Sequence, residues 1–373
     1  MEHTQGEAVR KVVHVSTASS WRGGERQALF LASGLADEGF SSIAAVRRGS
    51  EMHIRCVENG IPVEPLPFMG EFDGFSMLRL AALLRKTQAD IVHAHDAHGV
   101  SFASIAGWLQ RVPAVATRRV DFPLRSVWKY KGLARLICIS EAIRSICASA
   151  GLSPSEMPVV RSGIDTEWTR GIADDRNGVL QEFFPDGGVS YLLLNTASLV
   201  DHKGQKYLLE AMPAILEQFP DAGLVIAGEG LLRDSLTAQA EHLGIGKRVI
   251  LAGFRLDVPR LLVACDIYIM SSHMEGLGTS LMDAMAAEKP VIATDAGGMK
   301  ELLEDGVTGI QVPVCDSSAL AHGVISLLSD TQKRQTLAKK AREKALAEFS
   351  IARMVSGTAS VYRDILSDID GKA

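Results

Sequence analysis

The sequence predicts an α/β protein with two domains, each built on a parallel β-sheet. Its 373 residues suit two domains of roughly 100–200 residues each. Strand-like and helix-like segments alternate in both halves, which is typical of βαβ units. A polar stretch rich in Gly and Asp, residues 163–188, interrupts this alternation and is the expected linker. With 47% hydrophobic and 22% charged residues, the chain can bury a sizeable core.

The first half contains five expected strands and five expected helices. The strands are rich in Val, Ile and Ala, and most of the helices carry an apolar face. The expected strands are residues 11–16, 41–47, 89–95, 112–119 and 134–140. The expected helices are residues 25–38, 52–60, 75–86, 100–110 and 141–151.

The second half restarts the same alternation after the linker. The expected strands are residues 191–199, 222–230, 249–254, 266–272, 289–294 and 308–313. The expected helices are residues 204–219, 231–244, 258–265 and 280–288, followed by a mostly helical region from 317 to 369 with a break near 349–351. We place the domains at 1–168 and 169–349, and expect ligands at the carboxyl edges of the two sheets, in a cleft between them.

Charge, cysteine usage and hydropathy exclude several classes of protein. A net charge of −5 argues against a general nucleic-acid binder. The five cysteines are scattered and form neither a CxxC pair nor a zinc spacing, which favours reduced thiols. The N-terminus lacks the apolar core of a signal peptide, and no apolar run approaches the roughly 20 residues of a membrane span. We therefore expect a cytoplasmic protein, at most peripheral on the inner face of a membrane.

Three glycine-containing loops could bind phosphate. Gly23-Gly24 lies between a strand and a helix, where an anion site and a tight turn are equally good interpretations. Residues 228–233 mimic GxGxxG, but Arg233 occupies the third glycine position, so a plain turn is favoured over a dinucleotide site. Residues 275–280 open a helix that Thr279 or Ser280 can cap, and its dipole and loop amides suit a diphosphate.

Three charged residues accompany these loops. Glu275 gains nothing structural beside a phosphate site, so a sugar is its expected partner, through hydroxyls and an oxocarbenium-like carbon. Asp283 is expected in the first turn of the next helix, either as a favourable N-terminal carboxylate or as a ligand. Lys203 follows the first strand of the second domain, either as a solvated side chain or as a cation for a leaving phosphate.

Together these motifs resemble those of the family 4 retaining glycosyltransferases. The family pattern of two acids with seven residues between them is found here as Glu275 and Asp283, followed by KPVIATDAGG and then by Glu301-x3-Asp305-Gly306-x2-Gly309. Further matching motifs are Lys203-Gly204, Gly253-Phe254, Gly23-Gly24-Glu25-Arg26 and Ser162-Gly163-Ile164-Asp165. The resemblance covers nearly the whole chain.

The resemblance implies a GT-B fold, with two Rossmann-like domains whose parallel sheets face a central cleft. It also implies that a last helix, about residues 350–373, crosses back to the first domain. The implied activity is retaining transfer of a hexose-type sugar from a nucleotide-diphosphate sugar, most simply a UDP- or GDP-sugar, to a glycan or lipid-linked acceptor. Neither a metal nor another cofactor is expected. Many bacterial relatives build lipopolysaccharide, capsule or exopolysaccharide, so a similar role is expected here.

The resemblance also assigns roles to residues of this sequence. Glu275 would contact the donor sugar, Asp283 the ribose, and Lys203 the leaving phosphate, while Phe254 and Arg255 would border the base. Thr294 and Gly297-Gly298 would support the pocket. The full expected donor set is Gly23, Gly24, Gly253, Phe254, Arg255, Gly276, Leu277, Gly278, Thr279 and Asp283.

The sequence departs from the family pattern at three positions. Asp283 is one methylene shorter than the usual Glu, and Ser198 stands where an Arg is common. Arg119 stands where the family often has His. Our hypothesis is that Arg119, with help from Arg118, supplies the missing positive charge and acts in catalysis.

The acceptor side is less well specified. Residues 118–135 hold six basic residues with Phe122, Trp128 and Tyr130 among them, which indicates either a solvated segment or a surface for anionic lipid or phosphorylated glycan. His93, His95 and Asp96, at the end of a strand, are expected to face the acceptor rather than a metal. The only DxD, residues 368–370, is expected in a solvated tail.

Two alternative functions stay open beside glycosyl transfer. One is a sugar-nucleotide epimerase of the same fold, and the other is a non-catalytic sugar-nucleotide-binding protein. A dinucleotide dehydrogenase is the weakest alternative, because no complete GxGxxG is present.

Overall fold

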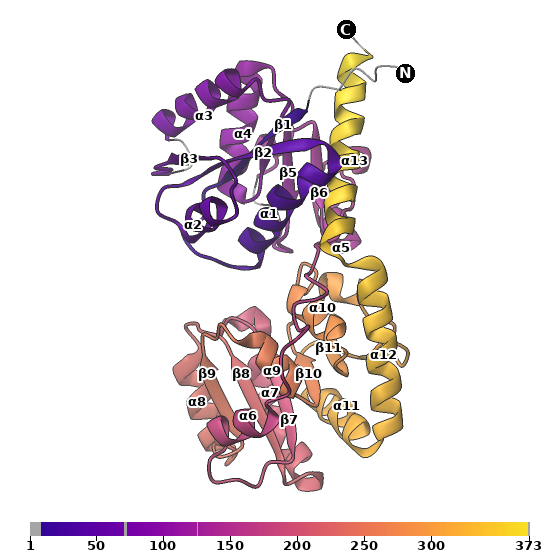
Figure 1. The fold of residues 1–373 in the computed structure, drawn as a ribbon. Coiled ribbons are helices and arrows are strands. Elements are labelled where there is room, and N and C mark those ends of the chain that lie inside the picture. The colour runs from indigo at the N-terminus through magenta and orange to yellow at the C-terminus, as the bar shows by residue number, and fades with distance from the viewer. Residues whose placement is uncertain (1–8, 71–72, 125, 372–373) are drawn as a thin grey trace, which may run out of the picture. The chain divides into compact units, whose positions relative to one another are not determined.

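The computed structural model describes residues 9–70, 73–124 and 126–371, and the chain divides into two compact units (Figure 1). The N-terminal unit comprises residues Met1–Gly163 and Ile351–Ala373, and the C-terminal unit comprises Ile164–Ser350. The first division therefore falls at Gly163, ahead of the expected position after residue 168. The second falls between Ser350 and Ile351, beside the expected break in the terminal helices.

The N-terminal unit is a six-stranded parallel sheet in the order β3-β2-β1-β4-β5-β6, flanked by helices (Figure 1). Its strands are β1 (Arg10–Ser16), β2 (Phe40–Arg47), β3 (Val63–Leu66), β4 (Ile91–Ala94), β5 (Ala114–Arg118) and β6 (Arg135–Cys138). Its helices are α1 (Gly23–Gly34), α2 (Glu51–Glu58), α3 (Gly74–Thr87), α4 (Ala97–Gln110), α5 (Glu141–Ser149) and α13 (Ile351–Asp370). The strand order reverses between β1 and β4, which makes the carboxyl edge of these two strands the place where ligands of such sheets bind.

Helix α13 closes the N-terminal unit although it comes from the far end of the sequence. It contacts α1, and its Tyr362 is fully buried with its ring edge-on to Phe40, at a centroid distance of 5.5 Å. Val355 and Ile365 join the same core cluster as Val12 and Ile91 of the central strands. The fold of this unit is therefore complete only once the C-terminal helix has docked.

The C-terminal unit repeats the architecture with the order β12-β11-β10-β7-β8-β9. Its strands are β7 (Tyr191–Thr196), β8 (Ala222–Ala227), β9 (Val249–Gly253), β10 (Ile267–Met270), β11 (Val291–Thr294) and β12 (Ile310–Val312). Its helices are α6 (Arg176–Phe183), α7 (Gln205–Gln218), α8 (Arg233–His242), α9 (Val258–Ala264), α10 (Thr279–Ala286), α11 (Ser317–Ser329) and α12 (Thr331–Glu348). Here the order reverses between β7 and β10.

Two elements were missed by the sequence analysis. Strand β3 has only four residues, one of them Pro65, which is tolerated because β3 lies at the edge of its sheet. Helix α6 lies inside the expected linker and is anchored through Arg176, which pairs with Asp266 at 2.7 Å and donates to the carbonyl of Ala264. Both depend on long-range contacts that local sequence does not show. Across the described helices, none is both long and apolar enough to cross a membrane.

Candidate functional site

The strand-order reversal of the C-terminal unit carries an ion pair. Lys203 ends the short turn after β7, and Glu275 lies in the loop after β10, so the two residues come from the two strands on either side of the reversal. The Lys203 ammonium pairs with the Glu275 carboxylate, and their side chains are only 18% and 15% exposed. Ser272 Oγ donates a further hydrogen bond of 3.4 Å to the same carboxylate oxygen.

Glycines bring these loops together. Gly204 has φ +65°, and a methyl group added there would lie 2.1 Å from the carbonyl oxygen of Ser271. Gly297 has φ +47°, and a methyl group there would lie 2.1 Å from the carbonyl oxygen of Glu275. The amide of Gly298 donates to that same carbonyl at 3.0 Å. These glycines are thus required both by their backbone conformation and by the close approach of a second backbone.

The pairing corrects one argument made from the sequence. Glu275 was expected to have no structural role, but its carboxylate is bound by Lys203 and Ser272. A partly buried pair of this kind is weakly stabilising at best, because desolvation offsets the attraction of the charges. The arrangement nevertheless sets a cation and an anion side by side at the expected ligand edge, where they could part to bind a phosphate and a hydroxyl group respectively.

Helix α10 differs from the expectation in how it begins. It starts at Thr279, its N-cap is Gly278 with φ +94°, and no described side chain caps it, so the expected caps by Thr279 and Ser280 are wrong. Asp283 lies in the second turn and is buried, so it is not a carboxylate of the first turn as expected. The Leu277 side chain is buried too, which leaves only its backbone for any donor contact.

The predicted base-binding residues have divergent environments. Phe254 is 66% exposed, and its amide donates to Glu229 at 3.3 Å. Arg255 pairs with Asp257 at 2.6 Å and with Glu182 at 2.8 Å, so two carboxylates already engage its guanidinium. Its role at a base stays a prediction.

The glycines of residues 228–233 are explained by packing. Methyl groups added at Gly228 and Gly230 would lie 1.9 Å and 2.2 Å from the carbonyl oxygens of Ala197 and Leu199. The loop therefore needs both glycines to lie against the backbone after β7, whether or not it binds a nucleotide.

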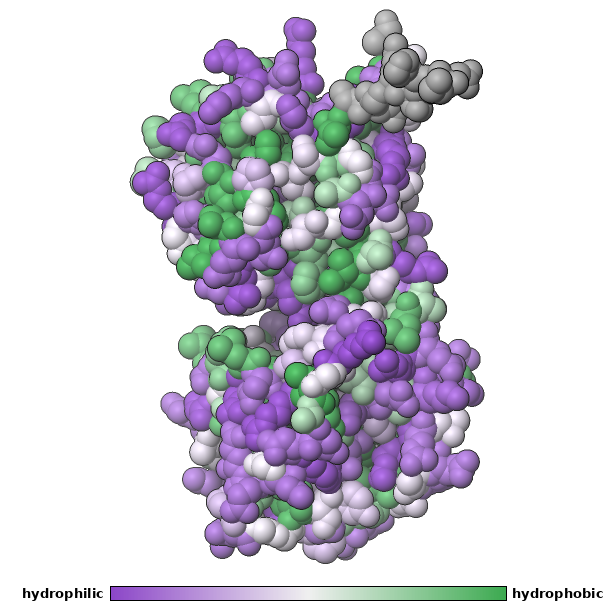
Figure 2. Space-filling view, in the orientation of Figure 1, coloured by the Kyte–Doolittle hydropathy of each residue, from purple (hydrophilic) through white to green (hydrophobic). Residues whose placement is uncertain are grey.

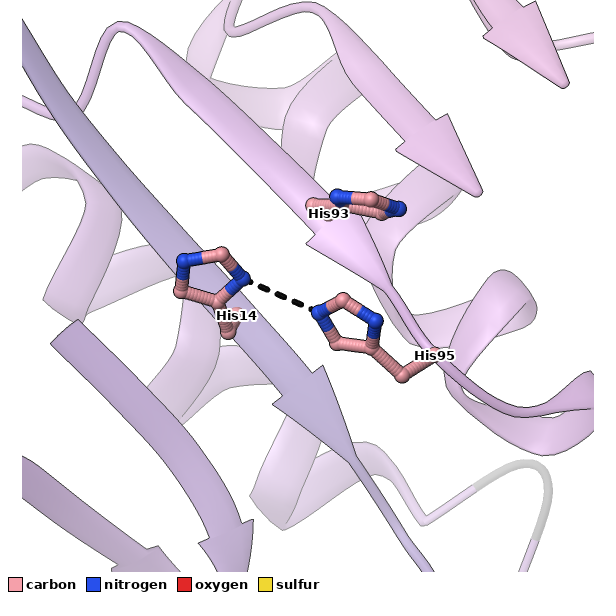
Figure 3. A group of neighbouring side chains, drawn as sticks. All are labelled: His14, His93 and His95. Atoms are coloured by element: carbon pink, nitrogen blue, oxygen red, sulfur yellow. Dashed lines mark hydrogen bonds between the residues drawn. The ribbon is translucent and has the colours of Figure 1, made fainter. Parts of the chain in front are cut away.

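The strand-order reversal of the N-terminal unit carries a cluster of three buried histidines (Figure 3). His14 of β1 lies opposite His93 of β4 in the strand register, and His95 follows β4. His14 Nδ1 and His95 Nε2 are 2.9 Å apart and hydrogen bonded. His93 bonds Tyr362 Oη at 2.5 Å and Thr117 Oγ1 at 2.7 Å. His14 was not predicted from the sequence, because its only local signal is a polar residue in the middle of an apolar strand.

A cavity of about 340 Å³ lies beside this cluster in the same unit. Gly24, His95, Asp96, Arg118 and Arg119, all named from the sequence, line it. The complete lining is Arg22, Gly24, Glu25, His95, Asp96, Ala97, Val100, Ala116, Thr117, Arg118, Arg119, Val120 and Tyr130.

The charges in this cavity are perturbed by burial. Burial lowers the pKa of Arg119 to about 10, although the nearby carboxylates of Glu25 and Asp96 oppose the shift. Burial raises the pKa of Glu25, whose carboxylate also accepts from the Arg22 amide at 2.9 Å. A guanidinium that lines a cavity and is hydrogen bonded to His95 is a candidate for binding an anion or a sugar hydroxyl.

The expected acceptor-side residues separate into different roles. His93 is fully buried and is not among the described residues that line the cavity, and its acceptor-side role stays a prediction. The Asp96 carboxylate binds the amide and hydroxyl of Thr17 at 2.6 and 2.7 Å and caps α4 through the Gly99 amide at 2.8 Å. Arg118 is buried and donates to the carbonyl of Phe122. Of the four expected acceptor-side residues, His95, Asp96 and Arg118 line the cavity, and Asp96 also caps a helix.

The described residues of segment 118–135 have different environments. Arg118 and Tyr130 are buried, and Arg135 pairs with Asp368 at 2.9 Å, while residue 125 lies outside the described residues. Phe122 and Trp128 are about half exposed. Hydrophobic residues are scattered over the displayed face of the N-terminal unit, whereas the displayed face of the C-terminal unit is mainly hydrophilic (Figure 2). Contact of this segment with a membrane stays a prediction.

The only DxD is helical and engaged by arginines. Asp368 and Asp370 belong to α13 rather than to a solvated tail. Asp368 pairs with Arg135 at 2.9 Å and Asp370 with Arg10 at 3.2 Å. These carboxylates have partners within their own unit.

Comparisons with known proteins agree with this architecture. The model of Glycosyltransferase Family 4 matches residues 21–168, and the model of Glycosyl transferases group 1 matches residues 185–344. The two matches fall within the N-terminal and C-terminal units almost entirely, and together they span most of the chain.

Two curated relatives illustrate the range of similarity. The putative glycosyltransferase EpsD of Bacillus subtilis is 34% identical over 210 residues, which is 56% of this chain and 55% of EpsD, so the match spans about half of that relative. The UDP-Gal:alpha-D-GlcNAc-diphosphoundecaprenol alpha-1,3-galactosyltransferase of Escherichia coli is 25% identical over 309 residues, covering 78% of this chain and 79% of the relative.

Solved structures show the same fold. Anabaena Alr3699/HepE in complex with UDP superposes with a TM-score of 0.84 at 22% identity, covering 95% of this chain and 100% of that one. The apo lipopolysaccharide outer core galactosyltransferase WaaB gives a TM-score of 0.73 at 14% identity, with 95% and 99% coverage. The chain has two doubly wound units, the Lys203 and Glu275 motifs lie at the strand-order reversal of the second, and both family models match. It therefore belongs to the family 4 glycosyltransferases of the GT-B fold.

Proposed function

We propose that this protein is a retaining glycosyltransferase that moves a hexose-type sugar from a nucleotide-diphosphate sugar to a glycan or lipid-linked acceptor in cell-surface polysaccharide or lipopolysaccharide synthesis. The observation that carries the proposal is the Lys203–Glu275 pair, held by glycine-built loops at the strand-order reversal of the C-terminal unit. A UDP-sugar is the preferred donor, because the E. coli relative is named for UDP-Gal and HepE has been solved with UDP-glucose. The lipid-linked acceptor is proposed because the name of the E. coli relative contains diphosphoundecaprenol.

In this proposal the donor separates the ion pair. Lys203 turns to the diphosphate and stabilises the negative charge that grows on it as the sugar leaves. Glu275 accepts hydrogen bonds from sugar hydroxyls and stabilises the positive charge that grows on the anomeric carbon. Lys203 thus exchanges a carboxylate for a diphosphate, and Glu275 exchanges an ammonium group for sugar hydroxyls, so each keeps polar partners when the donor binds.

Retention follows if the acceptor attacks from the face that the diphosphate leaves. The bond between the anomeric carbon and the diphosphate oxygen breaks, and its electron pair stays on that oxygen. The acceptor oxygen forms the new bond to the same carbon, and its proton passes to the departing diphosphate. Arg119, whose guanidinium lines the cavity of the N-terminal unit, supplies additional positive charge, and Asp283 binds the ribose.

The proposed reaction needs no metal ion or further cofactor. Lys203 provides a cation at the place where a metal would otherwise neutralise the diphosphate. The only DxD offers little to a metal, because both of its carboxylates are paired with arginines. The proposed location is the cytoplasmic side of a membrane, where nucleotide-sugar donors and lipid-linked acceptors meet.

A thermal-shift screen of the purified protein against UDP, GDP, ADP and their sugar conjugates tests the donor site. A ligand at one hundred times its dissociation constant adds about 2.7 kcal/mol to the free energy of unfolding. Glu275→Ala should lose the extra stabilisation by the sugar while keeping most of that by the nucleotide. Glu241→Ala, an exposed change on α8, is the matched control and should keep both. If no nucleotide shifts the melting temperature, the donor-site assignment is wrong.

Product analysis separates transfer from the two alternatives. The donor is incubated with a soluble oligosaccharide or with an undecaprenyl-diphosphate-linked sugar, and the anomeric configuration of the product is read by proton NMR. Transfer with retention gives an acceptor-dependent product of the same configuration as the donor. Conversion of the donor in the absence of acceptor would indicate an epimerase, and binding without conversion under any of these conditions would indicate a non-catalytic protein.

A further inference from the structure

The histidine cluster of the N-terminal unit occupies a place that apolar side chains usually fill. His14 and His93 are essentially unexposed, and His95 is only 6% exposed. A buried polar group without a hydrogen bond is destabilising, so each ring nitrogen needs a partner. The identity of those partners decides where the protons lie.

The chain of hydrogen bonds starts at Arg119. Its Nη1 donates to the carbonyl of His95 at 3.1 Å, and its Nη2 lies 3.4 Å from His95 Nδ1. A guanidinium can only donate hydrogen bonds. His95 Nδ1 must therefore accept, which means that it carries no proton.

The remaining protons follow in order. Burial lowers the pKa of both His95 and His14, so each ring is neutral and carries one proton. With Nδ1 unprotonated, the proton of His95 lies on Nε2, which donates to His14 Nδ1 at 2.9 Å (Figure 3). The proton of His14 then lies on its own Nε2, which donates to Ser42 Oγ at 3.2 Å.

We propose that Arg119, His95, His14 and Ser42 form a hydrogen-bond relay with a single direction, in which the guanidinium sets the tautomer of both imidazoles and the imidazoles hold the guanidinium in place at the cavity. His95 and His14 are thus positioning residues that act through Arg119. Both bonded nitrogens of Arg119 are used on His95, while its buried Nε has no hydrogen-bond partner among the described residues. The described side-chain hydrogen bonds of this guanidinium therefore all go to His95, and the nearby carboxylates of Glu25 and Asp96 act on it electrostatically.

His93 provides an internal contrast. Its ring packs against that of His95 at a centroid distance of 4.3 Å, but its partners are the hydroxyls of Tyr362 and Thr117. A hydroxyl either donates or accepts, so these partners do not dictate a tautomer. Arg119 should therefore control His95 and His14 but not His93.

A metal site is the competing interpretation of the same residues. One ring nitrogen of each histidine lies within 4.8 Å of the others, as in a three-ligand site. His14 Nδ1 and His95 Nε2 already share one hydrogen bond, which a metal bound to either of these nitrogens would break. The metal would also bring a second cation to the ring that binds Arg119. The relay therefore predicts that the cluster takes up no zinc.

The test is the imidazole nitrogen NMR spectrum of the full chain, labelled with 15N-histidine and free of ligand. Two-bond proton–nitrogen correlations show which nitrogen of each ring carries the proton. We expect the Nε2–H tautomer at His95 and at His14. In Arg119→Met both residues should change, although His14 has no described hydrogen bond to Arg119.

Arg118→Met is the matched control. Arg118 is adjacent and buried, but it donates to the Phe122 carbonyl rather than to a histidine, so its loss should leave both tautomers unchanged. An Nδ1–H tautomer at His95 in the wild type would overturn the proposal, as would an unchanged His14 in Arg119→Met. Uptake of one Zn²⁺ per chain with shifted His14 and His95 signals would overturn it too. If Arg119→Met does not fold, the wild-type tautomers decide the matter alone.

A kinetic experiment tests the positioning role, which rests on the proposed function. His95→Asn keeps an acceptor near the position of Nδ1, whereas His95→Gln moves the amide towards the position of Nε2. We expect His95→Asn to retain about tenfold more kcat than His95→Gln, corresponding to one hydrogen bond to a charged group, with a smaller difference in donor KM. Equal kcat values would remove the positioning role. Absence of turnover in the wild type would instead reject the proposed function and leave the NMR result standing.

Discussion

The two units share a sheet topology, but different kinds of polar group occupy the strand-order reversal in each. At the strand-order reversal of the C-terminal unit, a charged pair lies in loops that touch through glycine backbones. At the reversal of the N-terminal unit, neutral imidazoles are joined through side-chain hydrogen bonds and only one cation, Arg119, completes the chain. The comparison teaches that one topology can supply a backbone-built polar site or a side-chain-built one. The stability of the backbone-built site should be sensitive to any atom added to its glycines. The stability of the side-chain-built site should be sensitive to protonation of its histidines.

The largest effect should come from adding a methyl group to the backbone-built site. Gly204→Ala and Gly297→Ala would each place a carbon 2.1 Å from a carbonyl oxygen at positive φ, so we expect losses of more than about 3 kcal/mol in the free energy of unfolding. Gly306→Ala is the control, because its φ is +70° but no atom lies within 4 Å, and it should lose about 1 kcal/mol. Urea unfolding measures all three, and equal losses would refute the argument from close approach.

The next largest effect concerns activity. Lys203→Met removes the cation proposed for the leaving diphosphate and should lower kcat by about 10²–10³-fold, the usual effect of losing one group that stabilises developing charge. Lys206→Met is the control, because that lysine lies nearby but pairs with the exposed Asp201 at 3.5 Å. Steady-state kinetics with the identified donor provide the measurement. Comparable losses in the two variants would show that Lys203 has no special role.

The side-chain-built site should make the N-terminal unit sensitive to acid. Burial lowers the pKa of His14 from 6.5 to about 3. Between pH 6.5 and pH 3, this histidine is therefore protonated in the unfolded chain and neutral in the folded chain. This contribution to stability is complete above pH 6.5 and is lost as the pH falls towards 3, at up to about 1.4 kcal/mol per pH unit for each such histidine. Glu25, whose pKa is raised by burial, works in the opposite direction.

The measurement is urea unfolding at pH 7.5, 6.5 and 5.5, monitored in the N-terminal unit by the exchange of its backbone amides. His14→Gln should make the free energy of unfolding fall less steeply with decreasing pH, by about the amount that one histidine contributes. His322→Gln, an exposed change on α11, should leave it unaltered. Unfolding free energies that do not fall between pH 6.5 and 5.5 would contradict buried neutral histidines.

The smallest effects are expected at the DxD of α13. Asp368→Asn and Asp370→Asn remove exposed ion pairs with Arg135 and Arg10, which contribute roughly 0–1 kcal/mol each. Neither change should alter turnover or its response to Mn²⁺ or to EDTA. Loss of a metal requirement in either variant would show that these acids hold a catalytic ion.

The sequence by itself determined the order of the elements and the positions of the motifs. Val- and Ile-rich strands and amphipathic helices depend on local patterning, which is why the alternation predicted both parallel sheets. The glycine-containing motifs of the second half were also visible, since a backbone that needs φ above zero or a close neighbour selects Gly locally. The short strand β3 and helix α6 were not visible, because their stability comes from the sheet edge and from Arg176.

Only the tertiary structure decided which side chains meet. Lys203 and Glu275 were both named from the sequence, but their pairing depends on two strands that become neighbours across the reversal. Asp96, read as an acceptor contact, proved to cap α4, and His14 entered the cluster because β1 lies beside β4. Contacts between residues far apart in the chain are set by the packing of whole elements, and local sequence carries no record of that packing.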